Sequence, residues 1–204
     1  MSSPYKALIF DLGKVIFDLS FDRVFHCWAS ASGQQAEVIK NRFQFDEFFD
    51  AFERGEISAR DFRAEVSRRL GLTLTDELFD EGWCALYLDA YAGINALLAS
   101  LKKQYQLVAL TNTNSIHAQV WKIKYQESLS HFDKIFCSHE LKTRKPEQRA
   151  YQCVLDYLAV EARQTIFLDD SSANTTGAAQ LGMQSILVAS QPQMQADLRK
   201  MLYP

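Results

Sequence analysis

The chain contains five short apolar runs, and each run is continuous rather than alternating with polar residues. A continuous run of this kind is typical of a strand that is covered on both faces, as in a parallel sheet between two layers of helices. The five runs are Ala7–Phe10, Leu107–Leu110, Ile135–Cys137, Thr165–Leu168 and Ser185–Val188. They predict a buried parallel sheet as the core of the protein.

Helical patterns lie between these runs. Apolar residues recur at i, i+3, i+4 and i+7 over residues 94–101 and again over residues 151–158. Pro146 stands shortly before the second pattern, and proline is tolerated in the first turn of a helix. Since strands alternate with helices, we expect an α/β protein with a doubly wound, Rossmann-like parallel sheet.

The spacing of the first two runs sets this chain apart from a simple doubly wound sheet. A crossover between parallel strands needs about a dozen residues, whereas nearly a hundred residues separate Phe10 from Leu107. No convincing strand pattern occurs in this interval. We therefore expect an all-helical cap inserted after the first strand, with a core at residues 1–17 and 92–204 and the cap at residues 18–91.

The interval itself carries two helical stripes and two signals for helix starts. Four phenylalanines recur with helical spacing over residues 45–52, and a second apolar stripe runs from Phe62 to Leu70. Ser58 and Thr75 are residue types that cap helix N-termini. We interpret the phenylalanine stripe as the core of the cap, and the alternative is that one or two of its rings line a substrate site.

The composition excludes several classes of protein. Of 204 residues, 48% are hydrophobic and 23% are charged, which is ordinary for a soluble globular protein. The formal net charge of −3 does not favour a nucleic-acid partner, and no apolar run approaches the roughly 20 residues that span a bilayer. The N-terminus leads directly into the first apolar run without a signal-peptide pattern. We expect a cytoplasmic protein, a monomer or homodimer, without a nucleic-acid or membrane partner.

Cysteines and histidines are scattered along the chain without metal-ligand spacing. No two cysteines form a C-x-x-C pair, so we expect reduced, mostly buried thiols rather than disulfides or a zinc site. The residues are Cys27, Cys84, Cys137 and Cys153, with histidines at His26, His117, His131 and His139.

Polar residues follow four of the predicted strands. The carboxyl ends of parallel strands lie along one edge of a sheet, where ligands bind. The residues are Asp11 after the first run, Thr111 and Asn112 after the second, Lys145 beyond the third, and Asp169 and Asp170 after the fourth. Each alone is equally consistent with a helix cap, a turn or a solvated loop, but together they predict a single polar crevice.

Three carboxylates in one crevice need a compensating charge. Two like charges at about 4 Å repel by roughly 4 kcal/mol at an effective dielectric constant of about 20, and a cation or a shared proton relieves this repulsion. Oxygen ligands without histidine or thiolate favour Mg²⁺. Such a site, with a lysine and a hydroxyl nearby, suits a phosphate ester, because a carboxylate can attack phosphorus in line.

Four motifs resemble those of the haloacid dehalogenase-like hydrolases. They occur in the order and spacing of that family over the whole chain, and the inserted helices match the cap that the family carries between its first two motifs. The motifs are Ala7-Leu8-Ile9-Phe10-Asp11-Leu12-Gly13, Leu110-Thr111-Asn112, Arg144-Lys145-Pro146 and Phe167-Leu168-Asp169-Asp170, followed by Asn174. Three segments, residues 10–13, 53–58 and 144–147, are similar to the subgroup that contains a bacterial alpha-D-glucose-1-phosphate phosphatase.

The resemblance implies a role for each motif residue. Asp11 would be the nucleophile and a magnesium ligand, and Lys145 would neutralise charge on Asp11 and on the phosphoryl group. Thr111 and the amide of Asn112 would bind the phosphoryl oxygens. The other magnesium ligands would be the carbonyl of Gly13, Asp170, and Asp169 with support from Asn174. The first step would leave an aspartyl-phosphate on Asp11.

Gly13 departs from the family pattern. Most phosphatases of the family have an aspartate here, which acts as general acid and then as general base. Three explanations stay open: the leaving oxygen is stable as an anion, a cap residue such as Asp18, Asp46 or His26 supplies the proton, or the protein binds phosphate compounds with little turnover. We favour the first, which predicts a sugar phosphate esterified at its anomeric carbon, such as a hexose 1-phosphate.

Two other functions use similar residues. A 2-haloacid dehalogenase also has an aspartate nucleophile, but relatives with that activity lack the acidic pair that Asp169 and Asp170 form here. A weakly catalytic, phospho-ligand-binding regulator also gathers carboxylates and a lysine, but its open face does not suit a cap. We therefore predict a Mg²⁺-dependent phosphatase whose cap moves about hinges near residues 18–19 and 89–93.

Overall fold

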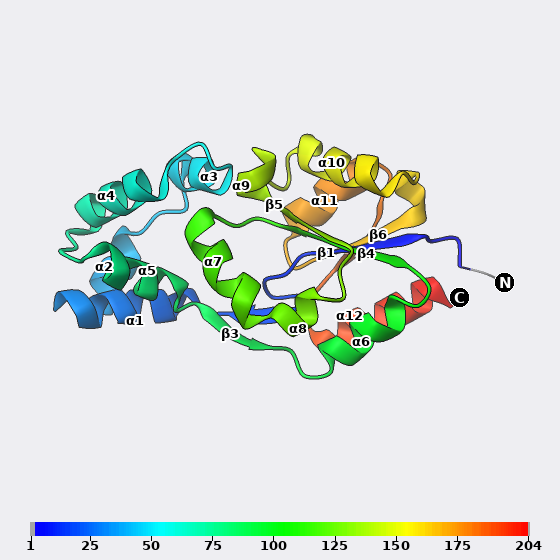
Figure 1. Ribbon diagram of the computed structural model, residues 1–204, viewed down its shortest axis with the longest axis horizontal. Helices are drawn as coiled ribbons and strands as arrows, with labels where there is room; N and C mark the ends of the chain where they lie inside the picture. Colours follow the sequence, from blue (N-terminus) through cyan, green and yellow to red (C-terminus); the bar gives the residue numbers. More distant parts are fainter. Residues whose placement is uncertain (1–2, 204) are drawn as a thin grey trace.

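The computed structural model describes residues 3–203, and a five-stranded parallel sheet forms the centre of one end of the molecule (Figure 1). The strands are β1 (Ala7–Phe10), β4 (Gln106–Thr111), β5 (Lys134–Cys137), β6 (Thr165–Asp169) and β7 (Gln184–Leu187), in the spatial order β5-β4-β1-β6-β7. Each strand coincides with one of the five apolar runs, so the predicted α/β sheet is confirmed. Because β1 is central and the chain extends the sheet on both sides of it, the end of β1 lies at the topological switch point, where ligands bind.

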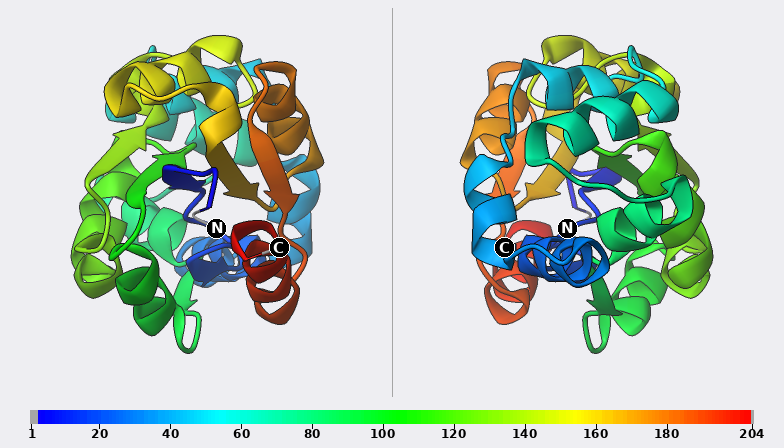
Figure 2. Two further views of the ribbon diagram at one scale, coloured as in Figure 1. Left: turned by 90° about the vertical axis from the view of Figure 1, so that its right-hand side faces the viewer. Right: turned by 90° about the vertical axis from the view of Figure 1, so that its left-hand side faces the viewer.

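Helices cover both faces of the sheet (Figure 2). One layer contains α6 (Ile94–Leu101), α7 (Ser115–Lys124), α8 (Gln126–Leu129) and α12 (Gln191–Leu202), and the other contains α9 (Ser138–Leu141), α10 (Gln148–Leu158) and α11 (Ser172–Gln180). Side chains alternate along β1, so Leu8 and Phe10 pack in the first layer while Ala7 and Ile9 pack in the second. A 3₁₀ turn, Ala162–Gln164, precedes β6. The predicted position of Pro146 in the first turn of a helix is wrong, because α10 begins two residues later.

Five helices fill the long interval after β1 and form the end of the molecule opposite the chain termini (Figure 1). They are α1 (Phe21–Ser32), α2 (Ala36–Arg42), α3 (Glu47–Glu53), α4 (Ala59–Leu70) and α5 (Asp76–Cys84). Two helix starts agree with the sequence: the hydroxyls of Ser58 and Thr75 accept hydrogen bonds from main-chain N–H groups in the first turns of α4 and α5. We refer to these five helices as the cap.

Two strands occur where none was expected. β2 (Phe17–Leu19) and β3 (Tyr87–Ala90) form a separate antiparallel pair that joins the cap to the sheet domain. Each strand is only three or four residues long and is only partly buried, so neither produces a recognisable period in the sequence. The pair lies at both proposed boundaries of the cap, and the division at residues 18 and 91 stays a prediction.

The cap has an aromatic core, as the phenylalanine stripe suggested. The rings of Phe52 and Phe62 stack with centroids 4.0 Å apart, and the rings of Trp28 and Trp83 stack at 5.6 Å. Phe45 is an exception, because it precedes α3 and is 59% exposed. The stripe therefore stabilises the cap through its buried members.

A buried histidine connects this cap core to the sheet domain. His117 of α7 stacks on the Trp83 ring at 4.6 Å. Its Nε2 lies 3.0 Å from the Trp83 carbonyl oxygen, and its Nδ1 lies 3.1 Å from the Asn114 amide nitrogen. A carbonyl only accepts, so Nε2 carries the proton and Nδ1 accepts from Asn114. Burial lowers the pKa of His117 from 6.5 to about 3, which keeps the ring neutral.

The cysteines are less buried than expected. Among the four, only Cys137 is buried, and the others are partly exposed; all four are free thiols. The expectation of reduced thiols is met, whereas the expectation that most are buried is wrong, because Cys27 and Cys84 lie on cap helices near the surface.

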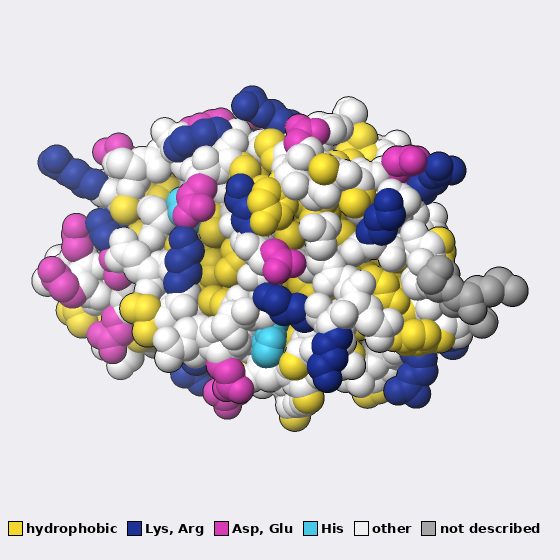
Figure 3. Space-filling view, turned by 45° about the vertical axis from the view of Figure 1, so that its right-hand side comes forward, with side chains coloured by type: hydrophobic (Ala, Val, Ile, Leu, Met, Phe, Trp, Pro, Cys, Tyr) yellow, Lys and Arg dark blue, Asp and Glu magenta, His cyan; other side chains and the backbone are white. Residues whose placement is uncertain are grey.

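The surface in Figure 3 mixes both signs of charge. Lysine and arginine side chains alternate with acidic ones on that face, and apolar side chains lie between them. Within residues 3–203, no helix has both the length and the apolar character needed to cross a bilayer. The predicted absence of nucleic-acid and membrane partners stays a prediction.

The neutral His117 makes stability depend on pH. Below pH 6.5 the unfolded chain protonates this residue while the folded protein does not until about pH 3, so the unfolded state binds more protons and stability falls as the pH falls. Between about pH 7 and pH 5 the wild type should lose about 2 kcal/mol of unfolding free energy relative to His117→Gln. Urea unfolding of both proteins at each pH measures the difference, and parallel pH profiles would contradict the assignment.

Candidate active site

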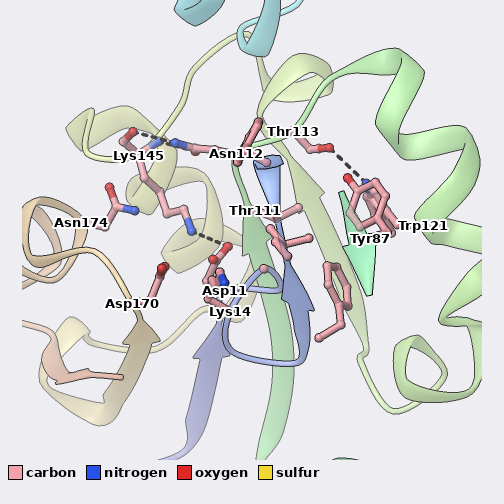
Figure 4. Close-up of a pocket in the computed structure, with 14 residues that line it drawn as sticks. Asp11, Lys14, Tyr87, Thr111, Asn112, Thr113, Trp121, Lys145, Asp170 and Asn174 are labelled. Carbon is pink, nitrogen blue, oxygen red and sulfur yellow. Dashed lines mark hydrogen bonds and ion pairs between the residues drawn. The ribbon is translucent and has the colours of Figure 1, made fainter. Parts of the chain in front are cut away.

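The ends of three central strands meet at a cavity of about 310 Å³ (Figure 4). Asp11 follows β1, Thr111 ends β4, and Asp170 follows the last residue of β6. The polar residues that line the cavity are Asp11, Lys14, Thr111, Asn112, Thr113, Lys145, Asp170 and Asn174. Six of the residues predicted to form the site therefore share one cavity, together with the backbone of Gly13.

Lys145 lies between two carboxylates at the base of this cavity. Its Nζ is 2.7 Å from Asp11 Oδ1 and 2.6 Å from Asp169 Oδ2, and the lysine side chain is 1% exposed. Burial opposes the charge of Lys145, but Asp11 and Asp169 outweigh this effect and raise the pKa of the ammonium above its ordinary value. The lysine therefore stays charged and holds one oxygen of Asp11.

Asn112 fixes the main chain of the same lysine. Its side-chain amide donates to the Lys145 carbonyl, and its Oδ1 accepts from the Lys145 N–H, both at 2.9 Å (Figure 4). Such a two-way amide contact sets the direction in which the lysine side chain leaves its loop. The side chain of Asn112 thus holds the backbone of Lys145 in place. Thr111 lines the cavity next to Asp11.

Asp169 is oriented by neighbours on its own loop and helix. It is 0% exposed, and the Asn174 amide nitrogen lies 3.0 and 3.1 Å from its two oxygens. The Ser171 N–H donates to Oδ1 at 2.8 Å. Asn174 thus contacts Asp169 directly, and its supporting role at a metal site stays a prediction; Asp170 projects toward the cavity and is more exposed.

The three carboxylates form one acidic cluster. One oxygen from each of Asp11, Asp169 and Asp170 lies within 4.8 Å of the others. Burial raises the pKa of Asp11 to about 7, with Lys145 opposing the shift, and burial together with Asp169 raises the pKa of Asp170. One lysine therefore does not neutralise the cluster, and its all-oxygen donors fit a hard divalent cation such as Mg²⁺.

Gly13 stands at the position that the family resemblance assigns to a general acid, and the end of the Leu19 side chain lies beside it. A Cβ atom at Gly13 would lie 2.6 Å from Leu19 Cδ1, which is closer than real Cβ contacts allow. Leu19 ends β2, at the base of the cap, so its side chain fills the space that a side chain at position 13 would need. An aspartate at this position would require Leu19 to move.

None of the three cap residues suggested as a substitute acid lines the cavity among the described residues. Asp46 caps α3 and pairs with Arg69, and His26 bonds the Asp22 carbonyl on an exposed face. The suggestions that Asp46 or His26 supplies the proton are therefore wrong, because neither residue lies in the cavity. Asp18 forms an ion pair of 2.8 Å with Lys14, and only Lys14 of this pair reaches the cavity.

An apolar wall faces the carboxylates, and the sequence analysis missed it. Its residues are Phe17, Leu19, Phe21, Tyr87 and Trp121. Most come from β2, β3 and the start of α1, where no regular period marks them. The predicted phenylalanine stripe does not contribute, because no residue of 45–52 lines this cavity.

The chain matches the haloacid dehalogenase-like hydrolase family over residues 5–182. D-ribitol-5-phosphate phosphatase of Bacteroides thetaiotaomicron is 25% identical over 203 residues, which cover 97% of this chain and 96% of the relative. Sesquiterpene phosphatase astK of Aspergillus oryzae is 29% identical over 187 residues, which cover 90% of this chain and 89% of the relative.

A solved structure has the same fold. It is a haloacid dehalogenase family enzyme of Bacteroides thetaiotaomicron in complex with magnesium and inorganic phosphate, with 27% sequence identity and a TM-score of 0.80. The superposition covers 92% of this chain and 96% of that chain. The doubly wound core with its helical insert is therefore shared along nearly the full length of both proteins.

If the acidic cluster binds Mg²⁺, the ion should stabilise the folded protein. A ligand present at 100 times its Kd adds about 2.7 kcal/mol, so the melting temperature should rise as Mg²⁺ is added. Asp170→Asn should weaken this response at least tenfold in Mg²⁺ concentration, since one anionic donor is lost. Asp197→Asn, on α12 and outside the cavity, is the matched control and should behave like the wild type. Equal melting shifts in all three proteins would exclude the site.

Proposed function

Because the chain belongs to the haloacid dehalogenase-like hydrolases, we propose that it is a Mg²⁺-dependent phosphatase that acts on a small sugar phosphate through an aspartyl-phosphate on Asp11. A phosphoric monoester hydrolase is the function that best suits its relatives and its site. The observation that carries the proposal is the position of Asp11, which is fixed by Lys145 at 2.7 Å and opens into a cavity that also contains Thr111.

The reaction has two steps, and this chain supplies the nucleophile for the first. A carboxylate oxygen of Asp11 forms a bond to phosphorus while the bond from phosphorus to the ester oxygen breaks, and the electron pair leaves with that oxygen. Water then attacks phosphorus, which releases inorganic phosphate and restores the Asp11 carboxylate. Lys145 offsets negative charge during both steps because its ammonium stays protonated beside Asp11.

The remaining residues bind and orient. The Thr111 hydroxyl and the main-chain N–H of Asn112 would donate to the phosphoryl oxygens, while the Asn112 side chain holds Lys145 in place. Asp11, Asp170 and the carbonyl of Gly13 would hold Mg²⁺, with Asp169 binding the ion or its water. When bound, the ion would neutralise charge on the carboxylates and on the phosphoryl group.

The lack of an acid at position 13 restricts the leaving group. No carboxylic acid other than the proposed metal ligands lines the cavity among residues 3–203, so the departing oxygen leaves without a dedicated carboxylic acid to protonate it. An anomeric oxygen is a better leaving group than an ordinary alkoxide, because the ring oxygen withdraws electron density from it. The apolar wall is compatible with the carbon face of a sugar ring. These two features support an anomeric hexose phosphate as substrate.

The other two functions agree less well with the site. A 2-haloacid dehalogenase needs no metal, yet this chain places three carboxylates around one point. A binding regulator without turnover needs no cavity closed by a cap. The cytoplasmic location and the monomeric or dimeric state remain predictions.

The leaving-group argument predicts a measurable substrate preference. With Mg²⁺ present, kcat/KM for glucose 1-phosphate should exceed that for glucose 6-phosphate at least tenfold, because a missing general acid typically costs 10²–10⁴-fold on a poor leaving group. Asp11→Asn should abolish both activities, and EDTA should stop both. Turnover that survives in Asp11→Asn would contradict the nucleophile assignment, and turnover that survives EDTA would favour the dehalogenase type of mechanism.

Two variants at position 13 test whether the missing acid limits hydrolysis of esters with a poor leaving group. Gly13→Asp alone places a Cβ 2.6 Å from Leu19 Cδ1, so the flexible end of the Leu19 side chain has to shift to accept it. Gly13→Asp combined with Leu19→Ala should have room for the acid and should raise kcat/KM for glucose 6-phosphate at least tenfold over Leu19→Ala alone. If the double variant and Leu19→Ala hydrolyse glucose 6-phosphate equally, the absent acid does not limit this enzyme.

A further inference from the structure

Two sequence segments lie against each other across the boundary between cap and sheet domain. Residues 53–58 end α3 and continue into the turn before α4, and residues 142–147 connect α9 to α10. α3 and α9 are in contact and appear side by side at the top of Figure 1. The second segment contains Lys145, so this contact reaches the catalytic lysine through its immediate neighbour.

Arg144 makes the central contact of this interface. Its Nε and one terminal nitrogen each lie 2.9 Å from Glu53 Oε2, and its other terminal nitrogen lies 3.0 Å from Asp50 Oδ2. Glu53 is only 8% exposed. Burial raises the pKa of Glu53 while Arg144 opposes that shift, so this carboxylate depends on the arginine for its charge. Both acidic partners of Arg144 belong to α3 of the cap.

Two further contacts join the same segments. Arg54 lies 3.4 Å from Glu147 Oε1, and the other oxygen of Glu147 accepts from the Thr143 hydroxyl at 2.6 Å. Lys142 donates to the Gly55 carbonyl at 2.7 Å. Gly55 has a φ of +66°, and a Cβ there would lie 2.4 Å from the His139 carbonyl oxygen, so only glycine permits this approach of the two backbones.

We propose that Arg144 is a positioning residue that couples the seating of cap helix α3 to the placement of Lys145. Its side chain is held by the cap, whereas the next residue is held by the sheet domain through the Asn112 amide and through Asp11 and Asp169. A shift of α3 away from the sheet domain would break the contacts of Arg144 and release one side of the lysine loop. The catalytic part of this role rests on the proposed function, because it assigns Lys145 to the reaction.

This arrangement gives the enzyme a way to join cap closure with catalysis. Closing the cap excludes water from the cavity, which strengthens the charge contacts within it. With Arg144 in contact with Glu53 and Asp50, the same closure also fixes the lysine that neutralises Asp11. Lys145 would neutralise charge on the phosphoryl group, which all phosphate esters share, rather than on the leaving group. Loss of the Arg144 contacts should therefore lower kcat/KM by the same factor for every phosphate ester.

Glu53→Gln tests the coupling, with Asp80→Asn as the matched control. In the control pair, Arg63 contacts Asp80 through two nitrogens at 2.7 and 2.6 Å and also contacts Asp76, but all three residues belong to the cap. Both variants thus remove one carboxylate charge from an arginine that retains a second acidic partner. Only Glu53→Gln affects a contact between cap and sheet domain.

The first readout is hydrogen exchange of the ligand-free protein, which does not depend on activity. Glu53→Gln should speed exchange in peptides that cover residues 51–57 and residues 142–147 together, whereas Asp80→Asn should leave residues 142–147 as in the wild type. Unchanged exchange at residues 142–147 in Glu53→Gln would overturn the proposal, as would equal changes there in both variants.

The second readout is hydrolysis of p-nitrophenyl phosphate and glucose 1-phosphate. Glu53→Gln should lower kcat/KM about tenfold for both esters, Asp80→Asn should lower neither, and Arg144→Gln combined with Glu53→Gln should lose no more than Arg144→Gln alone. Unequal losses on the two esters, or additive losses in the double variant, would contradict a shared action through Lys145. If the wild type hydrolyses no phosphate ester, the proposed function fails, and the exchange experiment alone decides the coupling.

Discussion

The ammonium of Lys145 between Asp11 and Asp169 is the interaction on which the rest of the site depends. These three charges are buried where neither carboxylate is tolerated without a partner, because an uncompensated charge in a low-dielectric interior is costly. The sheet makes the contact possible by ending β1 and β6 side by side. The loop beyond β5 supplies the lysine and fixes its backbone through Asn112. A third acid, Asp170, leaves the cluster with excess negative charge, and this excess is what fits a divalent cation.

The sheet and the carboxylate cluster could both be predicted from the sequence, because each depends on a pattern of neighbouring residues along the chain. A buried parallel strand is an unbroken apolar run, and the residue after each run must lie at the same edge of the sheet. Contacts between segments that are distant in the sequence produce no recognisable pattern in it, so they could not be predicted. The pair β2–β3 is too short to show a period, and the apolar wall combines residues from β2, β3, α1 and α7. The contact of Leu19 with position 13 could not be read from either residue alone. Asp46 and His26 are engaged elsewhere on the cap, which their sequence positions did not show.

Residues at the base of the cap line the cavity together with the residues at the strand ends. Leu19 occupies the space beside Gly13, and Phe17, Phe21 and Tyr87 bring apolar surface to the cavity. On the opposite side, α3 holds Arg144, the residue before Lys145. The segment between β1 and β4 thus lines the cavity through β2 and β3 and contacts Arg144 through α3.

The proposed reaction requires Asp11 to attack phosphorus, and trapping the phosphorylated enzyme shows whether it does. The enzyme with Mg²⁺ would be mixed with glucose 1-phosphate, quenched in acid within one turnover and digested, and the peptide that contains Asp11 would be analysed by mass spectrometry. We expect a phosphoryl group on Asp11 that is absent without substrate and absent in Asp11→Asn. A phosphoryl group on another residue, or turnover with an Asp11 peptide that is never modified, would contradict it.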